Sequence, residues 1–167
     1  MAVSVSLGDE NNKDIIVEIK AGAGGYEAEI FAGELFGMYS KYANKMLWKT
    51  VVADSKQGET GGFKEIILNI HGNAAYNKLK FESGIHKAQR ILATEPQGRL
   101  HTSTATVAIL SKANKVDIQR DNRDLELSSE KIRTYNFKDN KITDYRLNRN
   151  FDLQPIIEGS LDKIIGD

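Results

Sequence analysis

The sequence predicts an α+β protein with a mostly antiparallel sheet, packed helices and a compact, two-part organisation. Three observations support this fold class. Segments with apolar residues at every second position recur along the chain, one long segment has apolar residues at helical spacing, and polar or glycine-bearing turns separate neighbouring strand candidates. Strand runs joined by hairpins, with few helices between them, are typical of this class.

The first expected strand has one buried face, formed by Ile15, Val17 and Ile19, which alternate with Ile16, Glu18 and Lys20. Glycines break this strand. A helix over about 27–45 is then expected, because apolar residues recur at spacings of four, three and four, at Phe31, Leu35, Met38 and Tyr42.

Residues 47–52 and 63–70 have the composition of two more strands, and the polar stretch 54–62 predicts a hairpin between them. A short helix is expected within 73–81. Two further strands, 85–91 and 101–110, are separated by a loop.

Apolar residues have no regular spacing over 111–130, and we interpret this segment as a linker or crossover. Residues 132–137 and 142–147 then predict a second hairpin. A final helix is predicted from the spacing of Leu153, Ile157, Leu161 and Ile164, with Pro155 tolerated in its first turn.

Composition excludes several classes of protein. The 167 residues include no cysteine, so a disulfide framework, a thiolate zinc site and a cysteine nucleophile are excluded. A chain of this length can bury about 70% of its unfolded surface, enough for one domain or a closely packed pair. No run of 18 apolar residues and no secretory leader pattern is visible, so no membrane association and a cytoplasmic location are expected.

Charge is unevenly distributed although the chain is neutral overall, with 23 basic and 23 acidic residues. Residues 1–77 carry 7 Lys+Arg against 10 Asp+Glu, and 151–167 carry 1 against 4. Residues 78–110 carry 5 against 2, and 111–150 carry 10 against 7. The middle of the chain can therefore present a basic face to phosphate.

Patterns for cofactor or metal chemistry are incomplete. The segment 22–27 begins like a dinucleotide fingerprint but has Glu27 at its sixth position, which disfavours a nucleotide cofactor. His71, His86 and His101 lie 15 residues apart, without metal-ligand spacing. No cofactor, metal site or nucleophile motif is expected, and spacing alone indicates no enzyme.

The stretch 87–106 has the residue types that bind single-stranded RNA. Amides and hydroxyls can contact base edges, at Gln89, Thr94, Gln97, Thr102 and Ser103. His101 offers a ring for stacking, and Lys87, Arg90 and Arg99 can meet phosphate. Taken alone, a threonine-rich strand is more often simply an exposed strand.

Three blocks of sequence resemble bacterial or organellar class I peptide chain release factors of the UAA/UAG-reading type. The first is Ile16 to Tyr42, with Ala-Gly-Ala-Gly-Gly before the helix. The second joins Gly61 to Ile66 and Leu79 to Gly84 to the Gln89–Ser103 block, and the third is Ile132 to Asp144. The resemblance covers nearly all of 14–165. It implies a stop-codon recognition domain over 14–110, a linker over 111–130 and a fourth-domain segment over 131–167.

The resemblance also implies roles for individual residues. Ala93 and Thr94 fall on the family's Pro-x-Thr codon motif, in which Thr94 would contact the first two bases. Gly24 and Glu27, at the helix start, would bring backbone groups to the invariant uridine of the stop codon. His101 would stack on the second base, while Gln89 and Thr102 would read the third.

Two departures from the family pattern affect the expected function. Leu92 replaces the proline of the codon motif, which puts codon discrimination in question. Both Gly-Gly pairs are followed by an aromatic residue, Tyr26 or Phe63, so the Gly-Gly-Gln motif that promotes peptidyl-tRNA hydrolysis is absent.

The resulting expectation is a monomeric, non-enzymatic decoding module in the cytoplasm or an organellar matrix. Its expected partners are the small-subunit decoding centre with its rRNA and an mRNA stop codon. Two alternatives stay open: a ribosome-binding decoy that ignores codon identity, and a hydrolase whose catalytic domain belongs to a longer parent protein.

Overall fold

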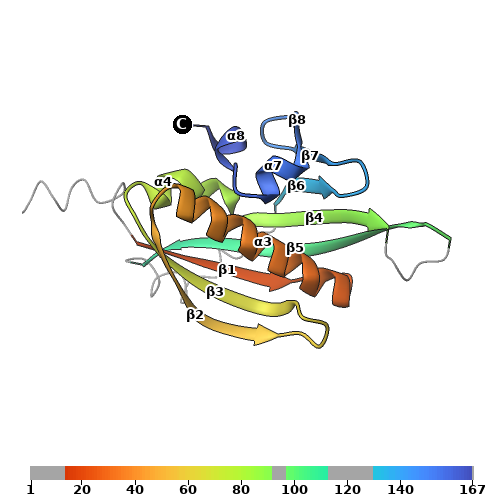
Figure 1. Cartoon of the computed structure of the whole chain (residues 1–167), viewed down its shortest axis with the longest axis horizontal. Coiled ribbons are helices and arrows are strands. Elements are labelled where there is room, and N and C mark those ends of the chain that lie inside the picture. The colour runs from red at the N-terminus through yellow and green to blue at the C-terminus, as the bar shows by residue number, and fades with distance from the viewer. Residues whose placement is uncertain (1–13, 92–96, 113–129, 167) are drawn as a thin grey trace, which may run out of the picture.

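The computed structural model describes residues 14–91, 97–112 and 130–166, which form one mixed sheet and several helices (Figure 1). Within these residues the sheet has eight strands in the order β2-β3-β1-β5-β4-β6-β7-β8. The pair β4 and β6 is parallel, and the other pairs are antiparallel. The predicted α+β class is confirmed. The strands are β1 Ile15–Ala21, β2 Lys49–Gln57, β3 Phe63–His71, β4 Gly84–Ile91, β5 Leu100–Ser111, β6 Lys131–Asn136, β7 Lys141–Asp144 and β8 Arg149–Asp152.

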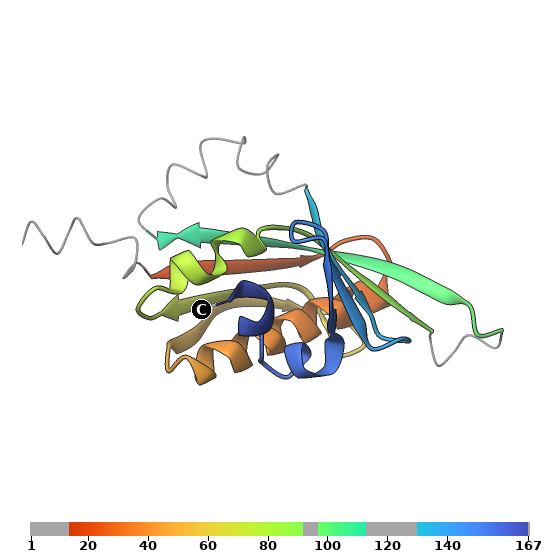
Figure 2. The ribbon, with the colours of Figure 1, turned by 90° about the horizontal axis from the view of Figure 1, so that it is seen from above.

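One long helix, α3, crosses β1, β3 and β5 on a single side of the sheet, and the two C-terminal helices lie on the same side (Figure 2). The helices are α3 Tyr26–Lys45, α4 Ala75–Leu79, the 3₁₀ helix η1 Lys80–Glu82, α7 Leu153–Ile157 and α8 Asp162–Ile165. All four residues of the predicted apolar stripe of α3 are buried. The helical period therefore located both the element and its inner face.

The core lies between α3 and the centre of the sheet. Ile15, Val17 and Ile19 are fully buried, as the alternation predicted, although Ile16 on the opposite face is buried as well. The antiparallel register sets Ile15 against Ile70 and Val17 against Leu68. Each such side chain contributes about 1.5–3 kcal/mol by leaving water.

The C-terminal part differs from its prediction in two respects. The second strand of the last hairpin ends at Asp144, and a further strand, β8, follows after a turn. The single final helix predicted through residues 153–164 is wrong, because the chain forms two short helices instead. Between them Gly159 adopts φ +115, a backbone conformation that favours glycine, and a Cβ added there would lie 3.0 Å from the Cβ of Lys41.

A fully buried arginine joins this C-terminal part to the rest of the sheet. Arg133 on β6 donates to both carboxylate oxygens of Glu82 at 2.7 Å, and its Nη2 lies 3.0 Å from Oδ2 of Asp144. Tyr39 of α3 adds a hydrogen bond to Glu82 at 2.9 Å. Burial by itself would raise the pKa of Glu82, but the guanidinium outweighs it and lowers this pKa to about 2.

His86 lies beside this cluster and is held in its neutral form. Its Nε2 is 2.8 Å from the carbonyl oxygen of Glu82, which can only accept, so Nε2 carries the proton. Its Nδ1 accepts from the hydroxyl of Tyr135 at 2.9 Å. Burial, together with the positive charge of Arg133, lowers the pKa of His86 to about 4.

Replacing Arg133 by methionine is expected to destabilise the protein by about 3–5 kcal/mol, because Glu82 and Asp144 would stay buried without their counter-ion. Urea unfolding at neutral pH measures the loss. The matched control is Arg149→Met on the exposed edge strand β8, expected to change stability by less than about 0.5 kcal/mol. Equal losses in the two variants would contradict the assigned role of Arg133.

Stability is expected to fall as the pH drops from about 6.5 to 4, partly because of His86. In this window the unfolded chain binds a proton at position 86 that the folded chain does not, so stability rises with pH at up to about 1.4 kcal/mol per unit. His86→Gln should reduce this slope, whatever it does to stability at pH 7. The check is a series of urea midpoints across the window, and an unreduced slope would refute the assignment.

Candidate nucleic-acid interface

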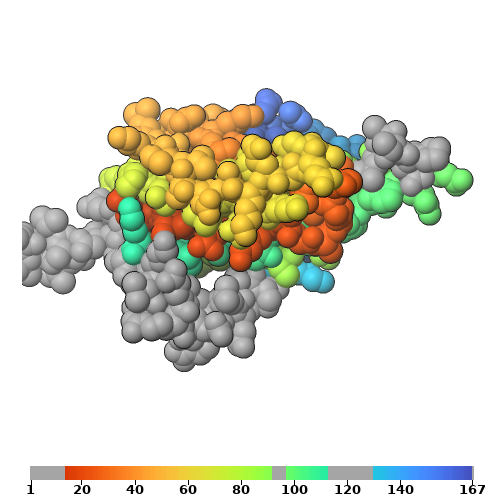
Figure 3. Space-filling model, turned by 90° about the horizontal axis from the view of Figure 1, so that it is seen from below, coloured from red at the N-terminus to blue at the C-terminus, as the bar shows by residue number. Residues whose placement is uncertain are grey.

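The hairpin of β4 and β5 extends beyond the neighbouring strands at one end of the molecule (Figure 1). Figure 3 shows the described start of β5, in green, projecting from the main body. Gln89 and Thr102 are direct cross-strand partners, and Arg90 pairs with His101. Because side chains alternate along a strand, Gln89 and Thr102 share the face away from α3, while Arg90 and His101 share the face toward it.

The turn formed by residues 22–25, which contains three glycines and precedes α3, runs along β5 at Ser103 and Thr104. The amide of Gly22 donates to the carbonyl of Thr104 at 2.8 Å, and the amide of Thr104 donates to the carbonyl of Ala23 at 2.9 Å. The Thr104 hydroxyl accepts from the Ala23 amide at 2.8 Å. These bonds extend the β1–β5 ladder and bring the beginning of α3 beside Ser103.

Gly24 allows this close approach. It adopts φ +124, and an added Cβ would lie 2.5 Å from the Cβ of Ser103. The helix then begins after Gly25 with no side-chain cap. The start of α3 is therefore exposed beside Ser103, on the helix side of the hairpin, and the role of Gly24 at a uridine stays a prediction.

Arg90 and Glu27 contact each other. The Nε of Arg90 lies 3.0 Å from Oε1 of Glu27, and the guanidinium also pairs with Glu34 of α3. Its Cζ lies 3.9 Å from the centre of the Phe137 ring. In this structure the donors of Arg90 point at carboxylates within the protein, so its contact with RNA phosphate stays a prediction.

The other predicted site residues divide into three groups. Lys87 is half-buried on the same face as Gln89, two residues earlier on β4. Arg99 is exposed just before β5. Leu92, Ala93 and Thr94 lie outside the described residues. The structure thus brings Gln89, Thr102 and Lys87 onto one face and leaves His101 on the other.

Sequence reasoning missed Glu34, Phe137 and Thr104 as residues that shape this region. A signal existed for Glu34: it lies seven residues after Glu27, so both carboxylates belong to one face of α3. Phe137 is distant in sequence from Arg90, and the parallel pairing of β4 with β6 that brings them together has no local signature.

The described parts of the chain were also searched for two other kinds of site. They contain no group of three or more His, Cys, Asp or Glu side chains placed to hold a metal ion. None of the helices described is long and apolar enough to cross a membrane.

Replacing Gly24 by alanine is expected to destabilise the protein by about 1–3 kcal/mol, because the new methyl group would clash with Ser103 in a strained backbone conformation. Gly37→Ala is the matched control, since Gly37 lies in the interior of α3 with open space around its Cα. It should stabilise by about 0.4–1 kcal/mol. Thermal unfolding of both variants tests this, and equal effects would refute the close packing at Gly24.

Comparison with known proteins places these observations in a family. The PCRF domain family model matches residues 3–107. Peptide chain release factor 1 of Acetivibrio thermocellus is 52% identical over 121 residues, which are 72% of this chain and 33% of that protein. Peptide chain release factor 1 of Staphylococcus aureus (strain JH9) is 51% identical over 119 residues, 71% of this chain and 33% of that protein. The chain thus spans about a third of the length of these relatives.

A solved structure supports the same fold. RF2 of Thermus thermophilus superposes with a TM-score of 0.83, covering 93% of this chain and 67% of that one, at 21% sequence identity. The structural likeness extends over the C-terminal strands and helices, beyond the part that the family model matches. Because the family model matches more than half of the chain, this chain belongs to the PCRF domain family of class I peptide chain release factors.

Proposed function

We propose that this chain is the stop-codon recognition superdomain of a release factor, which binds mRNA in the ribosomal decoding centre and reads UAA and UAG. The observation that carries the proposal is the face of the β4–β5 hairpin that points away from α3, where Gln89 and Thr102 are direct cross-strand partners. The proposed setting is the cytoplasm or an organellar matrix, with the chain acting as a monomer.

The chemistry of this face suits the third codon base. An amide and a hydroxyl can each donate or accept a hydrogen bond, so the pair Gln89 and Thr102 can tolerate adenine or guanine. Thr102 is exposed and Gln89 is half-buried, which leaves both within reach of a nucleotide. His101, on the other face of the same strand, is proposed to stack on the preceding base.

Peptidyl-tRNA hydrolysis is not part of the proposed activity. The chain contains no Gly-Gly-Gln motif, since Gly24-Gly25 is followed by Tyr26 and Gly61-Gly62 by Phe63. The proposal is therefore a binding module that recognises a stop codon without releasing the peptide. The same proposal divides the chain into the recognition domain 14–110, the linker 111–130 and the fourth-domain segment 131–167.

Binding to ribosomes programmed with UAA, UAG, UGA or a sense codon tests the function. We expect tighter binding with UAA and UAG than with UGA or the sense codon, measured by co-sedimentation. Gln89→Ala or Thr102→Ala should each weaken stop-codon binding about 5-fold, since one net hydrogen bond contributes about 1 kcal/mol.

Thr106→Ala is the matched control for these variants. It makes the same change on the same face of β5, four residues further from the hairpin end, and should leave binding unchanged. Codon-independent binding by the unsubstituted chain would refute codon reading.

Leu92 favours a second candidate function, a decoy that occupies the decoding site without distinguishing codons. Proline at this position would fix φ and remove an amide hydrogen, and leucine does neither. The decoy predicts competition with an intact release factor and equal binding to all four programmed ribosomes. Leu92→Pro would then introduce codon preference.

A further inference from the structure

An exposed aromatic side chain lies at the far end of β4 from the candidate interface. Phe81 of η1 is 62% exposed, although its ring has no polar group to interact with water. Two cations flank the ring: Lys80 Nζ lies 5.1 Å from its centre and Arg146 Cζ lies 5.7 Å from it. An exposed ring between two cations is a favourable surface for an unpaired base with its phosphate.

The interior of the protein holds Phe81 in this outward position. Its neighbour Glu82 is buried against Arg133, and successive residues of a 3₁₀ helix point about 120° apart, so Phe81 must face away from the cluster. Asp144 fixes the other side of the surface: its Oδ1 accepts the amides of Arg146 and Leu147, each at 3.0 Å. The ring and the arginine are therefore presented by rigid, buried anchors.

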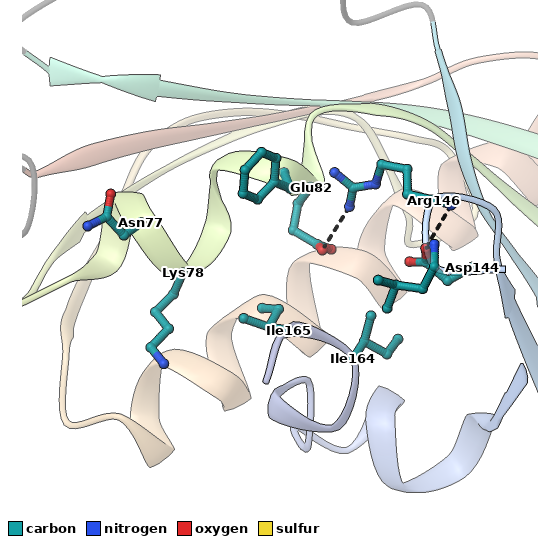
Figure 4. Close-up of a pocket in the computed structure, with 9 residues that line it drawn as sticks. Asn77, Lys78, Glu82, Asp144, Arg146, Ile164 and Ile165 are labelled. Carbon is teal, nitrogen blue, oxygen red and sulfur yellow. Dashed lines mark hydrogen bonds and ion pairs between the residues drawn. The ribbon is translucent and has the colours of Figure 1, made fainter. Parts of the chain in front are cut away.

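A pocket of about 280 Å³ opens beside the ring (Figure 4). Its lining combines aliphatic and aromatic surface with cationic groups, as Phe81, Leu147, Ile164, Lys78 and Arg146 illustrate. Figure 4 shows Arg146 reaching from the β7 side toward Glu82, which it meets at 3.9 Å, while α8 supplies the apolar wall. The pocket has apolar walls for a flat base and polar groups at its rim.

The local charge favours an anionic partner. Arg133 and Arg146 together balance the two carboxylates at the floor of the pocket, Glu82 and Asp144. Lys78 adds positive charge in the lining of the pocket, and Lys80 adds it beside the Phe81 ring. The surface thus joins apolar stacking area to excess positive charge, the combination that binds single-stranded nucleic acid.

We infer that Phe81, Lys78, Lys80, Arg146 and the adjoining pocket form a second RNA-binding site, which takes one unpaired nucleotide of a single strand. The base stacks on Phe81 and enters the pocket, and its phosphate pairs with the lysines. This site is separate from the proposed codon-reading face. Five residues of β4, Gly84 to Ala88, lie between η1 and Gln89, a span of about 17 Å.

The probe is a seven-nucleotide single-stranded RNA, titrated into the isotopically labelled chain and followed by NMR. We expect amide shifts for residues 77–82 and 144–147, and the same shifts in a Gln89→Ala/Thr102→Ala variant. Phe81→Ala should weaken binding at these residues by at least about 5-fold, as removal of one base stack does. Phe81→Tyr keeps the ring and should retain binding, whereas Phe81→Leu should not.

A charge control separates specific phosphate contact from general attraction. Lys80→Gln should weaken binding, while Lys138→Gln, in the turn between β6 and β7, should have little effect. Three results would each overturn the inference. The first is amide shifts confined to the β4–β5 hairpin, and the second is equal RNA affinity of Phe81→Ala and the unsubstituted chain. The third is amide shifts at the pocket with heptaglutamate but not with RNA. Because codon preference plays no part in this readout, its failure is distinguishable from failure of the proposed function.

Discussion

The ion cluster around Arg133 is the constraint on which the arrangement of the sheet depends. A buried guanidinium is costly unless its donors are satisfied, and here the partners come from η1 and β7, on either side of β6 in sequence. A slip of β6 by one residue against β4 would turn Arg133 to the opposite face and leave Glu82 and Asp144 unpaired. The cluster thus specifies the register of the parallel pair that attaches the C-terminal strands, in addition to any stability it provides.

A second arginine has a comparable role at the other end of β4. Arg90 joins two carboxylates of α3 to the ring of Phe137, and so ties the helix to both β4 and the residue that follows β6. The helix start, the glycine turn and the hairpin are consequently held in one arrangement. Both candidate RNA-binding surfaces are thus adjacent to internal ion pairs, which fix their side chains on rigid elements rather than on free loops.

The local spacing of apolar residues was sufficient to predict the long helix and strands. It was insufficient to predict contacts between residues that are distant in sequence. The stripe of α3 and the alternation of β1 could be read because each depends on neighbours a few residues away. The burial of Arg133 could not, since an isolated arginine in a strand candidate is normally solvated and its partner Glu82 lies 51 residues earlier. The prediction of one final helix failed for a related reason: the apolar spacing is helical, but Gly159 adopts φ +115 between two short helices, where it packs against Lys41 of α3.

The candidate site was predictable to the same extent. Gln89 and Thr102 face each other because β4 and β5 pair in a regular antiparallel register up to the end of the hairpin. The two strands predicted on either side of the loop already indicated this pairing. The same register necessarily separates His101 from Thr102, since adjacent residues of a strand point to opposite faces. The proposed roles of His101 and Thr102 therefore assign neighbouring bases to opposite faces of the hairpin.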